Sequence, residues 1–386
     1  MENWMKITKE LLINKFEESK REKKELYHQL QQYTQTGEKS IVYFGCGVQG
    51  NVIYHLLKKK NILPKFYCDN NPELHGKKVV EDKICISVEE LQKMKDVVVL
   101  LTVGLGSANI IYEQLIRLGI TEILKFPLDS LNIVTDDIFD LSQEEIERNM
   151  NKLYAILQDE MSCRIAYTKL YCMLASTKEM NKFNYIDIYS EPQYYPADII
   201  SLKKGECIVE GGSYIGDSLQ YFIEDMKCID FEKYICYELD EGNYNVLSNY
   251  VKTLDSNLRE RIVLRNCGIA DCNKTIQYES IEEGSNLRND IVTDNAKVAQ
   301  IVALDSELLD EKVTFIKMDI EGSEIDALIG CKKIITKQRP TLAICVYHKA
   351  CHLWEVPFLI HDYNSNYKLY LRHHTLITTD TVCYAL

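Results

Sequence analysis

The stretch that decides the fold is residues 208–218, which read Ile-Val-Glu-Gly-Gly-Ser-Tyr-Ile-Gly-Asp-Ser. The apolar run predicts a short strand, the glycines predict a tight turn, and Asp217 and Ser218 predict the start of a helix. Glycines let backbone N–H groups approach a ligand closely, and a helix N-terminus favours an anionic group. The segment therefore predicts a strand–turn–helix unit of a ligand-binding domain, although a tight connection without a ligand would give the same pattern.

Strands and helices alternate from this unit to the end of the chain. The predicted strands are 207–209, 234–237, 262–266, 314–318 and 341–347, followed by two consecutive strands at 368–374 and 381–386. This order predicts a parallel, doubly wound sheet that ends in an antiparallel hairpin. Ligands of such sheets lie outside the carboxyl ends of the strands, and Glu238 stands about 20 residues beyond Gly216, where a carboxylate accepts hydrogen bonds from ribose hydroxyls.

Further polar residues follow the next strands. Asn266, Gly268 and Asp271 would flank a nucleoside base at the third strand end. Asp319 and Glu321 stand where the fourth apolar run stops. Both are candidates for chemistry in the cleft, and capping of the following helix is the structural alternative for Asp319.

The fifth strand delivers His348 to the same edge as Asp319, so these two side chains are candidates for a general base. Asp319 with Glu321 also offers the hard oxygen ligands that a divalent cation prefers. Two carboxylates are few for a cation site, so no metal is predicted, and the cation stays an alternative.

These residues together resemble the FkbM family of methyltransferases. The resemblance spans residues 194–386 and rests on the motifs Tyr-Tyr-Pro at 194–196, the glycine-rich turn, Tyr-Glu at 237–238, Lys-Met-Asp-Ile-Glu-Gly-Ser-Glu at 317–324 and Tyr-Leu-Arg-His-His at 370–374. That family has the class I fold, uses S-adenosylmethionine and commonly methylates hydroxyls of sugars or other secondary metabolites. One departure is Glu210, because the first strand of the family usually ends in Asp, whose place is beside the methionine ammonium.

The resemblance implies a direct in-line displacement, in which a hydroxyl of a sugar or glycan precursor attacks the sulfonium methyl group. The catalytic candidates are Asp319, His348 and Glu321. The residues implied to bind S-adenosylmethionine are Glu210, Gly211, Gly212, Ser213, Tyr214, Gly216, Asp217, Ser218, Glu238, Asn266, Gly268 and Asp271. The implied partner is thus a small-molecule or glycan substrate.

A second fingerprint, Gly-x-Gly-x-x-Gly, occupies residues 45–50 between a predicted strand at 40–44 and a predicted helix at 51–59. With Asp-Asn-Asn-Pro at 69–72 and Gly-Lys-Lys-Val at 76–79, it resembles the N-terminal nucleotide-sugar-binding domain of bacterial sugar acetyltransferases. We predict a nucleotide-sugar or dinucleotide site at Gly45, Gly47, Gln49, Gly50 and Asp69. The alternative is a ligand-free Rossmann-like domain used for assembly.

The predicted fold class is α/β, with two doubly wound Rossmann-like domains joined by a helical connector. The boundaries are an N-terminal helix at 1–36, a nucleotide-binding domain at 37–130, the connector at 131–193 and a methyltransferase domain at 194–386. Two other functions compete, an NAD(P)-dependent oxidoreductase with two Rossmann-like halves and a catalytically silent nucleotide-sugar-binding scaffold. The 319–324 block favours the methyltransferase, since hydride transfer has no need of it.

Composition limits the partners and the compartment. The net charge of −13 disfavours nucleic acid and anionic lipid as partners. Apolar runs stay below about 18 residues, so no membrane span is predicted. The 14 cysteines form no Cys-x-x-Cys pair and indicate a reduced, cytoplasmic setting. A zinc site built from Cys345, His348, Cys351 and His352 is disfavoured because Cys345 lies in a predicted buried strand. A homo-oligomer is left open.

Overall fold

A computed structural model describes residues 2–103, 105–125, 136–175, 185–227, 230–281, 284–286, 297–376 and 379–386. The chain forms two compact units. The C-terminal unit comprises Met1–Met5, Arg148–Tyr167 and Tyr185–Leu386, and the N-terminal unit comprises Lys6–Glu147 and Thr168–Asn184.

The C-terminal unit is built on a seven-stranded sheet with the order β16-β17-β15-β14-β7-β8-β9. Its strands are β7 (Cys207–Gly211), β8 (Lys233–Tyr237), β9 (Ile262–Arg265), β14 (Phe315–Met318), β15 (Thr341–Cys345), β16 (Leu369–His373) and β17 (Thr381–Ala385). The first five strands in the chain pair in parallel, while β17 pairs antiparallel with β15 and β16. The prediction of a mostly parallel sheet with a terminal antiparallel hairpin is confirmed. Because the strand order reverses between β7 and β14, a crevice is expected at their carboxyl ends.

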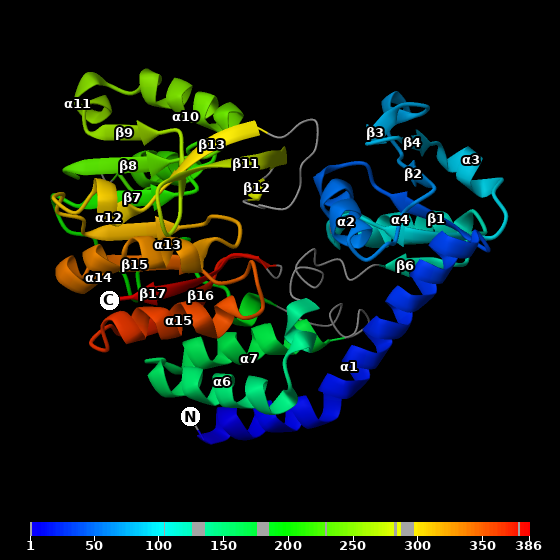
Figure 1. Cartoon of the computed structure of the whole chain (residues 1–386), viewed down its shortest axis with the longest axis horizontal. Helices are drawn as coiled ribbons and strands as arrows, with labels where there is room; N and C mark the ends of the chain where they lie inside the picture. The colour runs from blue at the N-terminus through cyan, green and yellow to red at the C-terminus, as the bar shows by residue number, and fades with distance from the viewer. Residues whose placement is uncertain are drawn as a thin grey trace. The chain divides into compact units, whose positions relative to one another are not determined.

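Helices pack on this sheet (Figure 1). They are α9 (Asp217–Gln220) continued by η4 (Tyr221–Asp225), α10 (Glu241–Thr253), α11 (Ser256–Arg259), α12 (Leu304–Glu307), α13 (Glu324–Gly330), α14 (Lys332–Gln338) and α15 (His352–Tyr363). Leu219 and Phe222 from α9–η4, with Leu247 from α10, form one core with Ile208 and Tyr234 of the sheet. This burial fixes the start of α9 and therefore the turn that precedes it.

A second, four-stranded sheet in this unit was not predicted. Its order is β10-β13-β11-β12, from β10 (Gly268–Ile269), β11 (Lys274–Ile281), β12 (Gly284–Asn286) and β13 (Lys297–Val302). β10 comes directly after the short loop that follows β9, and the side chain of Ile269 in β10 is buried. The sheet thereby holds Gly268 at the edge of the crevice.

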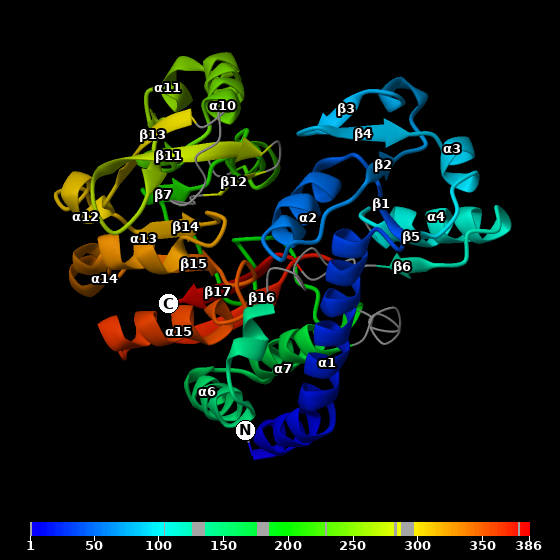
Figure 2. The same cartoon turned by 45° about the vertical axis from the view of Figure 1, so that its right-hand side comes forward.

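The N-terminal unit contains a six-stranded sheet with the order β3-β4-β2-β1-β5-β6 (Figure 2). Its elements are β1 (Ser40–Phe44), α2 (Val48–Lys58), β2 (Phe66–Cys68), η1 (Pro72–Leu74), β3 (Lys78–Val80), β4 (Lys83–Ile86), α3 (Val88–Gln92), β5 (Val97–Leu101), α4 (Leu105–Arg117) and β6 (Ile123–Lys125). The doubly wound order is confirmed, whereas the β3–β4 hairpin was not predicted from its two short apolar runs.

Alternate residues of β1 face opposite layers of this unit. Ile41 and Tyr43 join a core with α2 and with the end of α1 (Glu2–Thr36), whereas Val42 and Phe44 join a core with α3 and α4. Helices therefore cover both faces, which accounts for the all-apolar run of β5.

The remaining helices are η2 (Asp136–Asp140), α6 (Gln143–Ile156), α7 (Glu160–Leu174) and η3 (Tyr185–Asp187). Within the C-terminal unit, Arg372 of β16 donates to Asp159 at the start of α7 and to Asp198, and the hydroxyl of Ser162 accepts from the backbone N–H of Leu371. These contacts fix the terminal hairpin. In the described part of the chain, every helix is too short or too polar to cross a bilayer.

Candidate active site

A cavity of about 260 Å³ opens at the carboxyl ends of β7, β8 and β14 in the C-terminal unit. Eight of the predicted site residues line it: Gly212, Tyr214, Asp217, Ser218, Glu238, Gly268, Asp319 and Glu321. The cavity is also lined by residues that the sequence analysis did not assign to a site, among them Gln193, Tyr194, Lys317, Tyr347 and Asp380.

The glycine-rich turn is held against the end of β14. Gly212 has a φ of 72°, and a Cβ atom there would lie 1.8 Å from the carbonyl oxygen of Asp319. Only glycine fits such a position, since both the backbone conformation and the contact exclude a side chain. The close approach brings the turn and Asp319 side by side in the lining of one cavity.

Glu238 links the turn to the end of β8. Its Oε2 accepts a hydrogen bond from the backbone N–H of Tyr214 at 2.8 Å, and its Oε1 accepts one from that of Asp240 at 2.8 Å. Burial raises the pKa of Glu238, and these backbone donors oppose that rise. The side chain of Asn243 is a third hydrogen-bond partner. A carboxylate offers about four lone-pair sites, so Glu238 can still accept a hydrogen bond from a bound ligand.

Glu210 lies beneath the turn and is fully buried. Its Oε1 is 3.0 Å from Nζ of Lys317, which also donates to the carbonyl oxygen of Gly212 at 2.9 Å. Burial alone would lower the pKa of Lys317, but Glu210 and Asp319 raise it well above its usual range. Glu210 itself does not line the cavity and is paired with Lys317, which does. A ligand ammonium would therefore have to compete with Lys317 for the carboxylate of Glu210.

Four other predicted cofactor residues shape the loops from outside the lining. Ser213 is buried and its hydroxyl donates to the carbonyl oxygen of Glu210, while Gly211 ends β7 and Gly216 precedes α9. Asn266 donates to the carbonyl oxygens of Glu238 and Leu239, which fixes the loop after β8.

Asp271 is exposed and lies 3.8 Å from Lys274. It is not among the residues that line the cavity, because the chain turns into the second sheet before reaching it.

Asp319 is held by two tyrosine hydroxyls. Tyr194 donates to its Oδ2 at 2.8 Å and Tyr347 donates to its Oδ1 at 2.9 Å. Nε2 of His348 lies 3.3 Å from the same Oδ1. These contacts fix the orientation of the carboxylate.

His348 is buried behind Asp319 and lies among carboxylates. Its Nδ1 is 2.8 Å from Oε1 of Glu324, and its Nε2 is 3.7 Å from Oε2 of Glu321. Burial alone would lower the pKa of His348, but Glu324, Glu321 and Asp319 raise it to about 10. The imidazole is therefore positively charged at neutral pH. A protonated ring has no lone pair to accept a proton, so His348 is unsuited to the predicted role of general base.

Glu321 lines the cavity and has the properties of a base. Burial raises its pKa to about 7; His348 opposes the rise, and Asp319, Glu324 and Asp380 add to it. Its backbone is in the left-handed region, with a φ of 56°. A backbone held in that region by its surroundings is common where a side chain must be aimed at a site.

Asp380, at the turn before β17, adds a further carboxylate to the lining. Burial raises its pKa, and Asp319 raises it further. Its Oδ2 accepts from the Thr379 hydroxyl at 2.8 Å, and its Oδ1 accepts from the Gln193 amide at 3.3 Å. The cavity is consequently strongly acidic on the side of β14 and β17.

The acidic side of the cavity contains a group of side chains that could bind a metal ion. Within the described ranges, ligand atoms of Asp319, Glu324 and His348 lie within 4.8 Å of one another. However, each ring nitrogen of His348 already faces a carboxylate, and the charged imidazole has no lone pair for a metal. The ion pairs of His348 thus account for these buried carboxylates without a metal ion, and a metal would have to displace the proton of the imidazole.

The lining residues that the sequence analysis did not assign to a site differ in how readily they could have been predicted from the sequence. Lys317 interrupts an otherwise apolar strand, which is a recognisable anomaly for a buried position. Tyr347 adjoins a predicted candidate. Gln193 and Asp380 have no local signal, because they reach the cavity from chain segments far from the glycine-rich turn in sequence.

In the N-terminal unit, the fingerprint forms a compact loop. A Cβ atom on Gly50 would lie 2.1 Å from the carbonyl oxygen of Gly45, so α2 packs tightly on the loop. Asp69 accepts from the backbone N–H groups of Cys46 and Asn71, both at 2.9 Å. Asp69 therefore links the glycine-rich loop to the loop that follows β2. Of the predicted second-site residues, only Asp69 lines the large cavity of this unit, and the side chain of Gln49 lies outside the described residues.

Comparisons with known proteins agree with this geometry. Residues 210–369 match the family model described as the methyltransferase FkbM domain. The chain is similar to the crystal structure of methyltransferase FkbM from Methylobacillus flagellatus KT, with 22% identity, a TM-score of 0.65 and 90% of each chain covered. That similarity shows the fold.

An rRNA methylase from Streptococcus thermophilus aligns with 48% of this chain and 87% of its own length, at 13% identity and a TM-score of 0.30, which is too low to carry an argument. A search of curated proteins gives no match.

Proposed function

We propose that this chain, whose residues 210–369 form a methyltransferase FkbM domain, transfers a methyl group from S-adenosylmethionine to a hydroxyl of a sugar or similar polyol. The observation that carries the proposal is the acidic cavity at the carboxyl ends of β7, β8 and β14, with Glu321 at a pKa of about 7 beside the fixed carboxylate of Asp319. The resemblance to a family that commonly methylates hydroxyls supports the choice of acceptor.

The lining suits the methyl donor. S-adenosylmethionine would supply an electrophilic methyl group on a positively charged sulfur. Asp217, Glu238 and Asp319 give the cavity negative charge near the turn, which favours a cationic ligand. Glu238 can still accept a hydrogen bond from a ribose hydroxyl, and Leu239 and Ile269 offer apolar surface for a base. A dinucleotide carries two phosphates, which these carboxylates would repel, so the lining disfavours the oxidoreductase alternative.

Glu321 is the residue best suited to accept the proton of the acceptor hydroxyl. A base works best when its pKa lies near the operating pH, and a positioned base accelerates such steps by roughly 10²- to 10⁴-fold. With a pKa of about 7, Glu321 is partly ionised at neutral pH and binds a proton readily. An alcohol is a weak nucleophile, so this assistance is needed as it attacks the methyl group.

Asp319 has a different part in this scheme. Each of its oxygens accepts a hydrogen bond from a tyrosine hydroxyl, that of Tyr194 or Tyr347, which fixes its orientation, and its negative charge raises the pKa of Glu321. His348 contacts Asp319 from behind and is itself paired with Glu324. We therefore assign base chemistry to Glu321 and positioning to Asp319 and His348.

A methyl-transfer assay with radiolabelled S-adenosylmethionine tests this proposal. The acceptor panel contains neutral sugars, nucleotide sugars and, as a control, primary amines. We expect labelled product from an acceptor that has a free hydroxyl and none from its deoxy analogue. Transfer to amines alone would refute hydroxyl methylation, and failure to bind S-adenosylhomocysteine in titration calorimetry would refute the cofactor assignment.

A further inference from the structure

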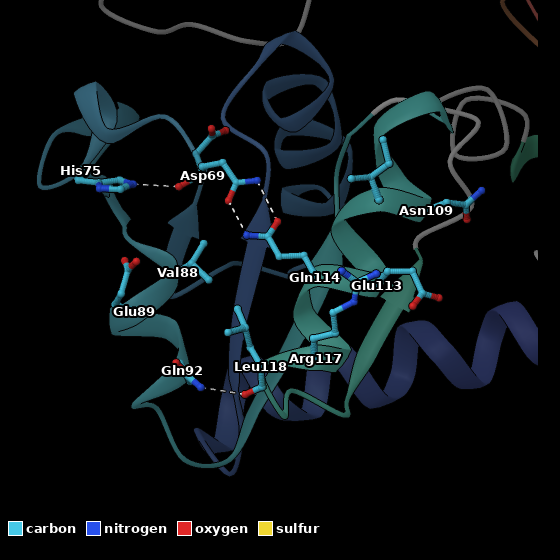
Figure 3. Close-up of a pocket in the computed structure, with 12 residues that line it drawn as sticks. Asp69, His75, Val88, Glu89, Gln92, Asn109, Glu113, Gln114, Arg117 and Leu118 are labelled. Atoms are coloured by element: carbon cyan, nitrogen blue, oxygen red, sulfur yellow. Dashed lines mark hydrogen bonds between the residues drawn. The ribbon is translucent and has the colours of Figure 1, made fainter.

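The N-terminal unit contains a cavity of about 830 Å³ that the proposed function does not use (Figure 3). It lies between α3 and α4, beside the carboxyl end of β2. The glycines of the fingerprint do not line it. Of the predicted nucleotide-site residues, the cavity shares only Asp69.

The centre of this cavity is a pair of amide side chains. Nδ2 of Asn70 donates to Oε1 of Gln114 at 3.0 Å, and Nε2 of Gln114 donates to Oδ1 of Asn70 at 2.9 Å. The pair joins the residue that follows Asp69, after the end of β2, to α4, and Figure 3 draws its two hydrogen bonds as dashed lines at Gln114. Each amide keeps one N–H and one lone pair, so the pair presents two donors and two acceptors in fixed positions.

Two further polar side chains on the wall are oriented by backbone contacts. Nε2 of His75 lies 2.9 Å from the carbonyl oxygen of Asp69, and because that oxygen only accepts, Nε2 carries a hydrogen and Nδ1 is left for a ligand. Nε2 of Gln92 donates to the carbonyl oxygen of Leu118 at 3.1 Å, which leaves its Oε1 for a ligand. Polar groups fixed in this way lose little entropy on binding.

The charge of the walls excludes anionic ligands. Three carboxylates, Asp69, Glu89 and Glu113, line the cavity with one guanidinium, that of Arg117. A phosphate or pyrophosphate would meet a net negative wall. Val88, Ile110 and Leu118 add apolar surface, which suits the C–H face of a ring.

We propose that this cavity binds a neutral polyhydroxylated ligand, namely one or two uncharged sugar residues. Hydroxyl groups both donate and accept, and the amide pair, the histidine and Gln92 offer both kinds of partner. The proposal concerns a cavity that shares only Asp69 with the predicted nucleotide site. It does not rest on methyl transfer, because binding here needs no reaction in the C-terminal unit.

Saturation-transfer NMR on the full-length protein tests the proposal. The probes are glucose, galactose, mannose and N-acetylglucosamine, with UDP and NAD as anionic probes. We expect at least one neutral sugar to bind. Gln114→Ala should lower the affinity for that sugar by about tenfold, since it removes hydrogen bonds to the ligand and to Asn70. Gln32→Ala, at an exposed amide of α1, is the matched control and should leave binding unchanged.

Two controls distinguish loss of sugar binding from loss of folding: the melting temperature of each variant, and the second variant Gln114→Glu. The glutamate can still accept from Asn70 but donates nothing, so it should weaken sugar binding at an unchanged melting temperature. The proposal is overturned if no neutral sugar binds, if UDP or NAD competes with the sugar, or if sugar binding persists in both Gln114 variants. S-adenosylhomocysteine titrated into the same samples reports separately on the proposed function and should be unaffected by either variant.

Discussion

Nδ1 of His348 lies 2.8 Å from Oε1 of Glu324, and both side chains are buried. Burial alone would raise the pKa of Glu324, but His348 and His352 lower it well below its usual range. The pair is therefore ionised at neutral pH. Through its other ring nitrogen the imidazole contacts Asp319, so one charged histidine joins the start of α13 to the wall of the cavity.

Glu321→Gln removes the proposed base and keeps the size of the side chain. We expect kcat to fall by roughly 10²- to 10⁴-fold with little change in affinity for S-adenosylhomocysteine, because a base acts on the transition state. In the parent enzyme the rate should rise with pH around a value near 7, where Glu321 loses its proton. That rise should be absent from the residual activity of the variant. A variant with near-normal turnover would exclude Glu321 as the base.

Asp319→Asn separates base chemistry from positioning. The charge of Asp319 helps to raise the pKa of Glu321, so its removal should move the midpoint of the rate–pH profile to lower pH while lowering kcat. Tyr347→Phe, which removes one hydroxyl from Asp319 and keeps its charge, is the matched control and should leave the midpoint nearly unchanged. If Asp319→Asn abolishes the profile instead, Asp319 is itself the base.

His348→Gln tests the charged histidine through stability. The pKa of His348 is about 10 in the folded protein against 6.5 for the free side chain, so the native state holds a proton that the unfolded state releases between these values. This contribution is complete below pH 6.5 and is lost as pH rises towards 10. Its slope is about 1.4 kcal/mol per pH unit for one proton.

Denaturant unfolding at pH 7 and pH 8, below the usual thiol titration, should show this loss in the parent and a smaller one in the variant. Equal slopes in the two proteins would mean that His348 is not charged in the native state.

Removal of divalent cations should leave methyl transfer intact. The charge of His348 neutralises carboxylates that would otherwise need a cation, so dialysis against a chelator is expected to preserve the rate. Activity that disappears with the chelator and returns with Mg²⁺ would support the cation alternative at Asp319 and Glu321.

Glu238→Ala should weaken the binding of S-adenosylhomocysteine by roughly 1.5–3 kcal/mol, the range for hydrogen bonds to a charged group. The change also frees the backbone N–H of Tyr214, so the turn loses its link to β8. Glu238→Gln retains one acceptor oxygen and should give a smaller loss. Titration calorimetry checks both values, and unchanged affinity in both variants would remove Glu238 from the cofactor site.

The sequence was most informative where one segment fixes its own geometry. The run 208–218 predicts a strand, a turn and a helix start without reference to the rest of the chain, and β7 and α9 follow that order. The alternation of apolar runs likewise predicts parallel strands, because crossover helices bury both faces. The β3–β4 hairpin escaped prediction because strands of three and four residues leave no periodic pattern. The second sheet also escaped prediction, because its longer strands, β11 and β13, are rich in polar residues and lack a clear apolar run.

The sequence by itself determined which side chains stand at strand ends, and with them the class of fold and the candidates Glu238, Asp319 and Glu321. Only the tertiary structure decided their charge states and their roles. It buried Glu210 against Lys317, charged His348 by surrounding it with carboxylates, and brought Asp380 from the final hairpin to the cavity. The physical reason is that a pKa depends on burial and on charges contributed by distant segments, and neither is encoded locally.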